Sequence, residues 1–88
     1  MKILVVDDDP HIRDALAVGF QLQWPDSTVL VAADGEDGLR QFYAYDPDVV
    51  VLDVAMPWKN GFEVLQEIRR ISDVPVIMLT ARGEETDQ

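Results

Sequence analysis

Short apolar runs alternate along the chain with segments whose apolar residues recur at helical spacing. The apolar runs predict strands at residues 3–6, 28–32, 49–52 and 75–79. The first run has no polar–apolar alternation, which is typical of a strand covered on both faces in a parallel sheet. Strands that alternate with helices require right-handed crossovers. The pattern therefore predicts an α/β fold, a doubly wound parallel sheet with helices on both faces.

Three helices are predicted between these strands. Asp9 and Pro10 open the first as N-cap and first helical residue, and Trp24 before a proline ends it. The second spans about residues 36–45, although Gly38 within it costs on the order of 1 kcal/mol relative to alanine. The third follows Asn60, and one more helical turn is expected at residues 84–88. The side chains expected to face inward are Ile12, Leu16, Gly19 and Phe20, then Leu39, Phe42 and Tyr43, then Phe62, Leu65, Ile68 and Ile71.

Composition narrows the class of protein. The chain has 88 residues, 48% hydrophobic and 27% charged, which fits one small globular domain. The absence of cysteine excludes disulfides, thiolate metal sites and cysteine nucleophiles. The apolar runs are too short for a signal peptide or a membrane span, so a cytoplasmic location is expected.

The charge balance is strongly acidic. Seven basic and 17 acidic residues give a formal net charge of −10, which disfavours direct binding to nucleic acid or to an anionic membrane. Much of this charge serves solubility. The same charge would attract a divalent cation or a basic partner.

Carboxylates follow two of the predicted strands. Asp7 and Asp8 end the first, and Asp53 ends the third, at the edge where α/β sheets bind ligands. If these strands are neighbours, the three carboxylates converge and need a proton or a cation, for which Mg²⁺ is the natural choice. The alternative is that Asp8 and Asp9 cap the first helix and Asp53 caps a turn. Capping is favoured for Asp9, and the metal site is favoured for Asp7 and Asp8.

Asp53 also suggests a reaction. A carboxylate fixed beside a bound metal can attack phosphorus and form an acyl phosphate. Thr80, after the fourth strand, could donate its hydroxyl to a phosphoryl oxygen. The backbone amides of Ala55 and Ala81 could add further donors.

Three ordered motifs resemble the receiver domain of two-component response regulators: ILVVDDDP, DVVVLDVAMPWKNGFEVL and PVIMLTA. This resemblance covers essentially the whole chain and implies a flavodoxin-like strand order of 2-1-3-4. It implies that Asp53 is the phosphoacceptor, phosphorylated by a partner sensor histidine kinase. Asp8 would bind Mg²⁺ directly, Asp7 through water, and Ala55 through its carbonyl.

The resemblance also implies a switch. Thr80 would be the switch hydroxyl, reoriented on phosphorylation, and the small Ala81 would leave room for the phosphoryl group. Such a domain is not an enzyme; at most it phosphorylates itself from small donors and dephosphorylates itself.

The chain departs from the receiver pattern at its C-terminal end. Residues 1–88 are expected to form one receiver domain without the family's fifth strand, the lysine that ends it and the last helix. Neither Lys2 nor Lys59 stands where that lysine belongs. The output domain would lie outside this chain. An uncovered strand at residues 75–79 predicts self-association through the exposed sheet edge.

Two rival functions remain open from the sequence. A phosphatase of the haloacid dehalogenase type needs a DxDGT-like pattern, which the segment DDDPH does not provide. A binding module of the same fold that acts without phosphorylation is the main alternative. His11 is expected to face solvent, and Trp58 either contacts a kinase or covers the site.

Overall fold

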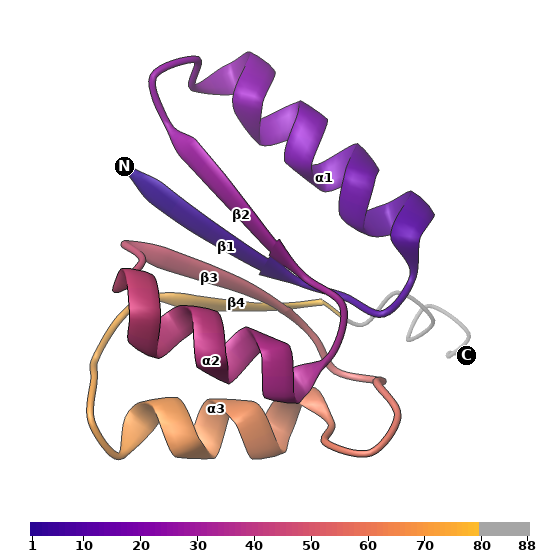
Figure 1. Cartoon of the computed structure of the whole chain (residues 1–88), viewed down its shortest axis with the longest axis vertical. Helices are drawn as coiled ribbons and strands as arrows, with labels where there is room; N and C mark the ends of the chain where they lie inside the picture. The colour runs from indigo at the N-terminus through magenta and orange to yellow at the C-terminus, as the bar shows by residue number, and fades with distance from the viewer. Residues whose placement is uncertain (80–88) are drawn as a thin grey trace, which may run out of the picture.

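The computed structural model describes residues 1–79, in which four strands and three helices alternate (Figure 1). The strands and helices predicted for this part of the chain are all present, with bounds that differ only slightly. The turn expected at residues 84–88 lies outside the described residues. The elements are β1 (Lys2–Val6), α1 (Pro10–Gln23), β2 (Thr28–Ala32), α2 (Gly35–Tyr45), β3 (Val49–Asp53), α3 (Gly61–Arg69) and β4 (Val76–Leu79).

The four strands form one parallel sheet in the predicted order β2-β1-β3-β4. In Figure 1, α1 lies on one face of the sheet, and α2 and α3 lie side by side on the other. Strand β1 is central and pairs with both β2 and β3, so that Val6 lies opposite Ala32 on one side and Leu52 on the other. The carboxyl ends of β1 and β3 are therefore adjacent, which is the arrangement that the carboxylate hypothesis requires.

The face covered by α2 and α3 holds the larger core. Gly38 explains how closely α2 approaches the sheet, because a Cβ atom there would lie 2.9 Å from a methyl carbon of Val6. The glycine that weakened the prediction of this helix thus allows it to pack. The buried residues of this core are Leu4, Val6, Ala32, Leu39, Phe42, Val50, Leu52, Met56, Val64 and Ile68.

The face covered by α1 holds a smaller core, made of Ile3, Val5 and Val51. Leu16 and Phe20 pack against it only partly buried, and α1 contains no fully buried residue. The prediction that Gly19 faces the sheet is wrong, since a Cβ atom there would meet nothing within 4 Å. The sheet side of α1 follows the spacing of Leu16 and Phe20, and Gly19 lies off that line.

Three aromatic or aliphatic residues predicted to face inward are exposed instead. Tyr43 is 58% exposed, Phe62 55% and Ile71 62%. In α3 the buried stripe is Gly61, Val64 and Ile68, so Phe62 is rotated away by one residue. Tyr43 is displaced in the same way from the buried Phe42, and Ile71 lies beyond the end of α3. A step of one residue turns a helix by about 100°, which is enough to move a side chain from core to solvent.

The predicted ends of α1 are confirmed. The Asp9 side chain accepts a hydrogen bond from the His11 N–H, Pro10 is the first helical residue, and Trp24 is the C-cap. At α3, Asn60 forms a capping box with Glu63, in which each side chain accepts from the other residue's backbone N–H. None of the helices described for residues 1–79 is both long and apolar enough to cross a membrane.

Candidate functional site

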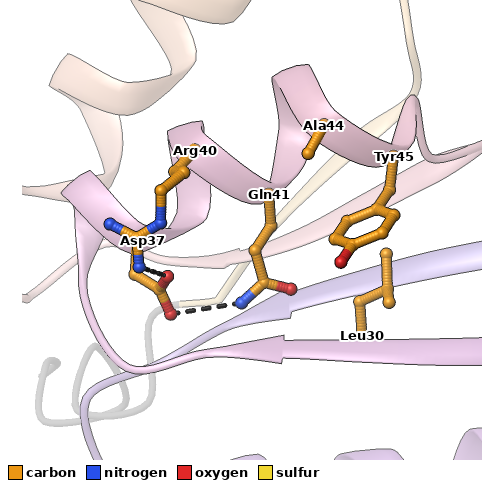
Figure 2. A pocket seen from close by; sticks show the side chains of 6 residues that line it. All are labelled: Leu30, Asp37, Arg40, Gln41, Ala44 and Tyr45. Carbon is orange, nitrogen blue, oxygen red and sulfur yellow. Dashed lines mark hydrogen bonds and ion pairs between the residues drawn. The ribbon is translucent and has the colours of Figure 1, made fainter.

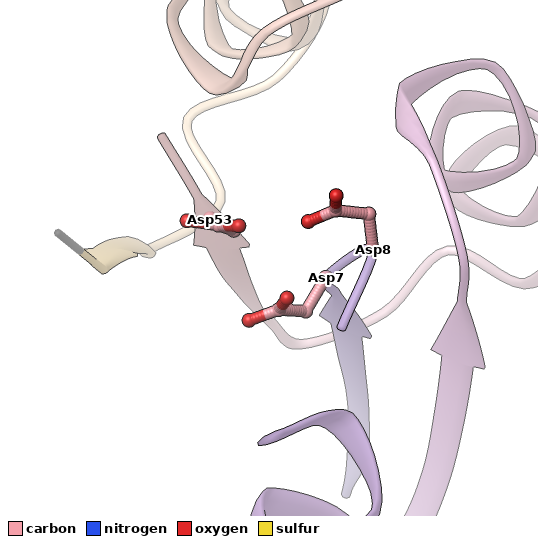
Figure 3. A group of neighbouring side chains, drawn as sticks. All are labelled: Asp7, Asp8 and Asp53. Atoms are coloured by element: carbon pink, nitrogen blue, oxygen red, sulfur yellow. The ribbon is translucent and has the colours of Figure 1, made fainter. Parts of the chain in front are cut away.

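Three carboxylates converge where β1 and β3 end. Asp7 and Asp8 directly follow β1, and Asp53 is the last residue of β3 (Figure 3). One carboxylate oxygen from each residue lies within 4.8 Å of the others. Asp9 is not part of this group, because its side chain caps α1. The structure therefore brings Asp7, Asp8 and Asp53 together as predicted, and separates them from Asp9.

The hydrogen bonds of these carboxylates are incomplete. Asp7 is 1% exposed and Asp53 2%, whereas Asp8 is exposed. Asp7 Oδ1 accepts the Asp9 N–H at 2.9 Å, but its buried Oδ2 has no hydrogen-bond partner among residues 1–79. Asp53 Oδ1 accepts the Ala55 N–H at 3.2 Å. A buried carboxylate oxygen without a donor is costly, and a cation is a partner that would satisfy it.

The electrostatics of the three carboxylates also favour a bound cation. Burial raises the pKa of Asp53, the Ala55 N–H lowers it in part, and the neighbouring Asp7 and Asp8 raise it further. Ionised together, the carboxylates destabilise one another. Oxygen ligands from several carboxylates suit a hard divalent cation such as Mg²⁺. The residues present therefore fit the metal that the sequence suggests.

Two residues that were not predicted as part of this site also shape it. The Arg13 Nη1 donates to the Asp7 carbonyl at 3.1 Å and ties α1 to the end of β1. At Gly61, a Cβ atom would lie 2.3 Å from the Asp53 carbonyl oxygen, so only glycine fits behind the phosphoacceptor candidate. The adjacent Asn60 and Gly61 indicate a turn in the sequence, but nothing in the sequence shows that this turn contacts Asp53.

The loop between β3 and α3 places the remaining candidates. Ala55 and Trp58 are exposed, and the buried Met56 anchors the loop in the core. Trp58 is 89% exposed, so the alternative in which its ring covers the site is wrong. His11 is exposed, as expected. Thr80 and Ala81 lie outside the described residues, and their assigned roles stay predictions.

A separate pocket of about 450 Å³ lies between α2 and β2 (Figure 2). Its polar side chains are already paired within the protein. Asp37 forms an ion pair with Arg40, and Gln41 donates hydrogen bonds to Asp37 and to the Val31 carbonyl. Among the described residues that line the pocket, no charged group is therefore left unpaired for a ligand. It is lined by Leu30, Asp37, Arg40, Gln41, Ala44 and Tyr45.

Known proteins are similar to this chain in sequence and in fold. The "Probable transcriptional regulator ycf27" of Guillardia theta is 47% identical over 87 residues, which make up 99% of this chain and 34% of that protein. The chain thus spans about a third of the length of the curated relatives it matches.

Solved structures agree with this relationship. The N-terminal domain of a response regulator receiver protein from Methanoculleus marisnigri JR1 has a TM-score of 0.81 and 38% identity, over 92% of this chain and 67% of that one. A chain from the crystal structure of histidine kinase ThkA in complex with response regulator protein TrrA has a TM-score of 0.80 and 39% identity, over 99% of this chain and 74% of that one.

The model of a protein family described as "Response regulator receiver domain" matches residues 3–88. The match includes the ends of β1 and β3, where the structure places the three carboxylates. The predicted fold and the predicted family are both confirmed. The chain belongs to the response regulator receiver domain family.

Proposed function

We propose that Asp53 is the phosphoacceptor of this receiver and that its phosphorylation requires Mg²⁺. The metal would be held by Asp7, Asp8, Asp53 and the carbonyl of Ala55. The main support is the buried Oδ2 of Asp7, which lies within a group of three carboxylates and has no hydrogen-bond partner in the described part of the chain. A satisfied structural cluster would leave no such oxygen.

We infer the reacting oxygen of Asp53 from its hydrogen bond. Oδ1 accepts the Ala55 N–H, so Oδ2 is the freer nucleophile. In the proposed transfer, Oδ2 attacks phosphorus, the bond from phosphorus to the donor's histidine nitrogen breaks, and that nitrogen keeps the electron pair and takes up a proton. Mg²⁺, when bound, would neutralise charge on the phosphoryl oxygens. In the same proposal, Thr80 is the switch hydroxyl and Ala81 contributes its backbone amide.

The proposed donor is a sensor histidine kinase. Support comes from the structural relative whose complex contains a histidine kinase and a response regulator. The proposal also includes an output domain outside this chain and the cytoplasmic location expected from the sequence. The receiver acts as a phosphoacceptor, with no activity beyond self-phosphorylation from small donors and autodephosphorylation.

Intact-mass measurement tests the proposal directly. The chain is incubated with Mg²⁺ and a small acyl-phosphate donor, and the wild type is expected to gain one phosphoryl group. Asp53→Asn should gain none, because the nucleophile is lost. Asp26→Asn, at an exposed aspartate outside the site, is the matched control and should gain one. Mg²⁺ binding without any phosphoryl gain would favour the phosphorylation-independent binding module.

We further propose that the edge strand β4 mediates association between copies of this chain. Ile77 on β4 is 51% exposed. The Pro75 and Leu79 carbonyls accept from Val50 and Val54, so the alternate residues Val76 and Met78 direct their backbone groups away from β3. Among residues 1–79, no strand pairs with that outer side. Free apolar edges favour pairing with a second chain.

Sedimentation at micromolar concentration tests this association. The wild type is expected to sediment as a dimer or larger species. Ile77→Lys should sediment as a monomer, since a charged side chain beside an edge blocks strand pairing. Val31→Lys, at an exposed position of the opposite edge strand, is the control and should behave as the wild type does. A folded wild-type monomer would refute the association without bearing on phosphorylation.

A further inference from the structure

Lys59 lies in the loop between β3 and α3, and its ammonium group joins two helices. Lys59 Nζ donates to Glu67 Oε2 of α3 at 2.5 Å and lies 3.7 Å from Glu36 Oε2 of α2. The Lys59 side chain is 24% exposed and that of Glu67 38%. This is the one ion-paired contact among residues 1–79 that links the loop to both helices.

The backbone beside Lys59 is strained. Trp58 has a φ of 66°, which is unfavourable for a residue with a large side chain. The Lys59 N–H donates to the Pro57 carbonyl at 2.8 Å, which closes a three-residue turn around Trp58. Such a conformation persists only where the surrounding structure holds it. The Trp58 ring is almost fully exposed, so its own packing does not hold the turn.

Contacts on either side of Trp58 do hold it. The Gly61 N–H donates to the Val54 carbonyl at 3.0 Å and closes the loop at its base. The Lys59 carbonyl packs on the start of α2, since a Cβ atom at Gly35 would lie 2.8 Å from that oxygen. Lys59 therefore meets α2 with its backbone and both helices with its side chain. Ala55, the proposed carbonyl ligand of the metal, lies in the same closed loop.

We propose that Lys59 is a positioning residue, whose ion pairs with Glu67 and Glu36 hold the loop of residues 54–60 in the form that presents Ala55 to the carboxylate site. This inference rests on the proposed function, because it gives Ala55 a role in metal binding. Without the ion pairs, the strained turn relaxes and the loop spends part of its time in other conformations. The metal then binds only the competent fraction, and its apparent affinity falls in proportion.

The sign of the effect separates this role from a simple charge effect. Lys59→Met removes a positive charge, and by electrostatics alone Mg²⁺ would then bind more tightly. The positioning role predicts weaker binding. A purely structural role would lower the stability of the fold and leave the Mg²⁺ affinity of the folded protein unchanged.

The test uses the full chain and Mg²⁺ alone as the probe. Lys59→Met is expected to raise the Kd for Mg²⁺ by roughly 3–10-fold, as for a competent fraction of about 0.1–0.3. It should also speed amide hydrogen exchange at Gly61, whose hydrogen bond closes the loop. Lys59→Arg, which keeps the charge, should bind Mg²⁺ nearly as the wild type does.

Lys2→Met is the matched control, because it removes the same charge. The Lys2 ammonium contacts the Tyr45 carbonyl, at the other end of α2 from the loop. This variant should leave Mg²⁺ affinity and Gly61 exchange unchanged. If Lys59→Met does not fold, Glu67→Gln tests the same contact from the partner side through hydrogen exchange alone. Gly61 should then exchange faster than in the wild type, and unchanged exchange would overturn the inference.

Unchanged or tighter Mg²⁺ binding by folded Lys59→Met would overturn the inference, as would unchanged Gly61 exchange. Failure of the proposed function looks different. In that case the wild type itself binds no Mg²⁺, while the exchange measurement still reports whether Lys59 holds the loop.

Discussion

The two faces of the sheet are covered to different depths. On the side of α2 and α3, the helix residues Leu39, Phe42, Val64 and Ile68 are buried against the strands. On the side of α1, none of the helix residues within 1–79 is buried, and the core consists of three strand residues. The same sheet thus has one face with a core shared by strands and helices, and one face whose buried core consists of strand residues alone. Figure 1 shows α2 and α3 on the first face and α1 on the second.

The carboxylate site is held differently on the two sides of the sheet. The loop that carries Ala55 and Lys59 runs from β3 to α3, and it is anchored on the well-packed side by Met56 and Gly61. On the α1 side, the supports of Asp7 are hydrogen bonds, from the Asp9 N–H and from Arg13. We therefore expect core substitutions to have large effects on the α2–α3 face and small effects on the α1 face.

The largest effect is expected from truncating Ile68. Its side chain is 1% exposed, and Ile68→Ala should lower the free energy of unfolding by about 3–4 kcal/mol, from lost burial and the cavity left behind. Leu16→Ala on α1 should cost only about 1 kcal/mol, because Leu16 is partly exposed and alanine favours the helix. Urea unfolding of both variants measures the difference. Equal losses would show that the two faces are packed alike.

A pair of helical glycines sharpens the comparison. Gly38→Ala on α2 should cost about 1–3 kcal/mol, because the new Cβ would lie 2.9 and 3.0 Å from the methyl carbons of Val6. Gly19→Ala on α1 should instead stabilise the protein by about 0.5–1 kcal/mol, since its Cβ meets nothing within 4 Å and alanine is the better helix former. Thermal unfolding gives both signs. A loss of stability in Gly19→Ala would mean that α1 lies closer to its surroundings than the structure shows.

The sequence predicts which helices and strands form better than it predicts which side of each helix faces the core. The order of the seven elements follows from apolar runs, prolines and caps, which are local signals. Phe62 and Ile71 were expected inside because they are apolar, but Gly61 determines which side of α3 approaches the chain of β3. The closeness of two backbones is a tertiary property, and the identity of a single glycine does not show which neighbour it will contact.

The same limit applies to the site. Asp7, Asp8 and Asp53 were predictable, because parallel strands that end in carboxylates bring them to one edge. The role of Arg13 was not, since its bond to the Asp7 carbonyl depends on how α1 leaves β1. Nor does the sequence show that Lys59 pairs with Glu67 and Glu36, because that contact requires α2 and α3 to lie side by side.

The smallest effect on stability is expected at Asp53, in the site that residues on both sides of the sheet support. Its pKa is raised in the folded state by burial and by Asp7 and Asp8, so ionisation at neutral pH favours the unfolded state. Without metal, Asp53→Asn should therefore stabilise the protein by roughly 1 kcal/mol near pH 7. The gain should shrink as the pH falls through the raised pKa towards the ordinary value of 3.8, because wild-type Asp53 then becomes neutral as well.

Saturating Mg²⁺ should reverse the order of stability of the two proteins, since the metal compensates the charge in the wild type and loses a ligand in the variant. Urea unfolding between pH 4 and pH 8, with and without Mg²⁺, measures all three trends. A wild type more stable than Asp53→Asn at pH 7 without metal would mean that the Asp53 charge is already compensated within the fold.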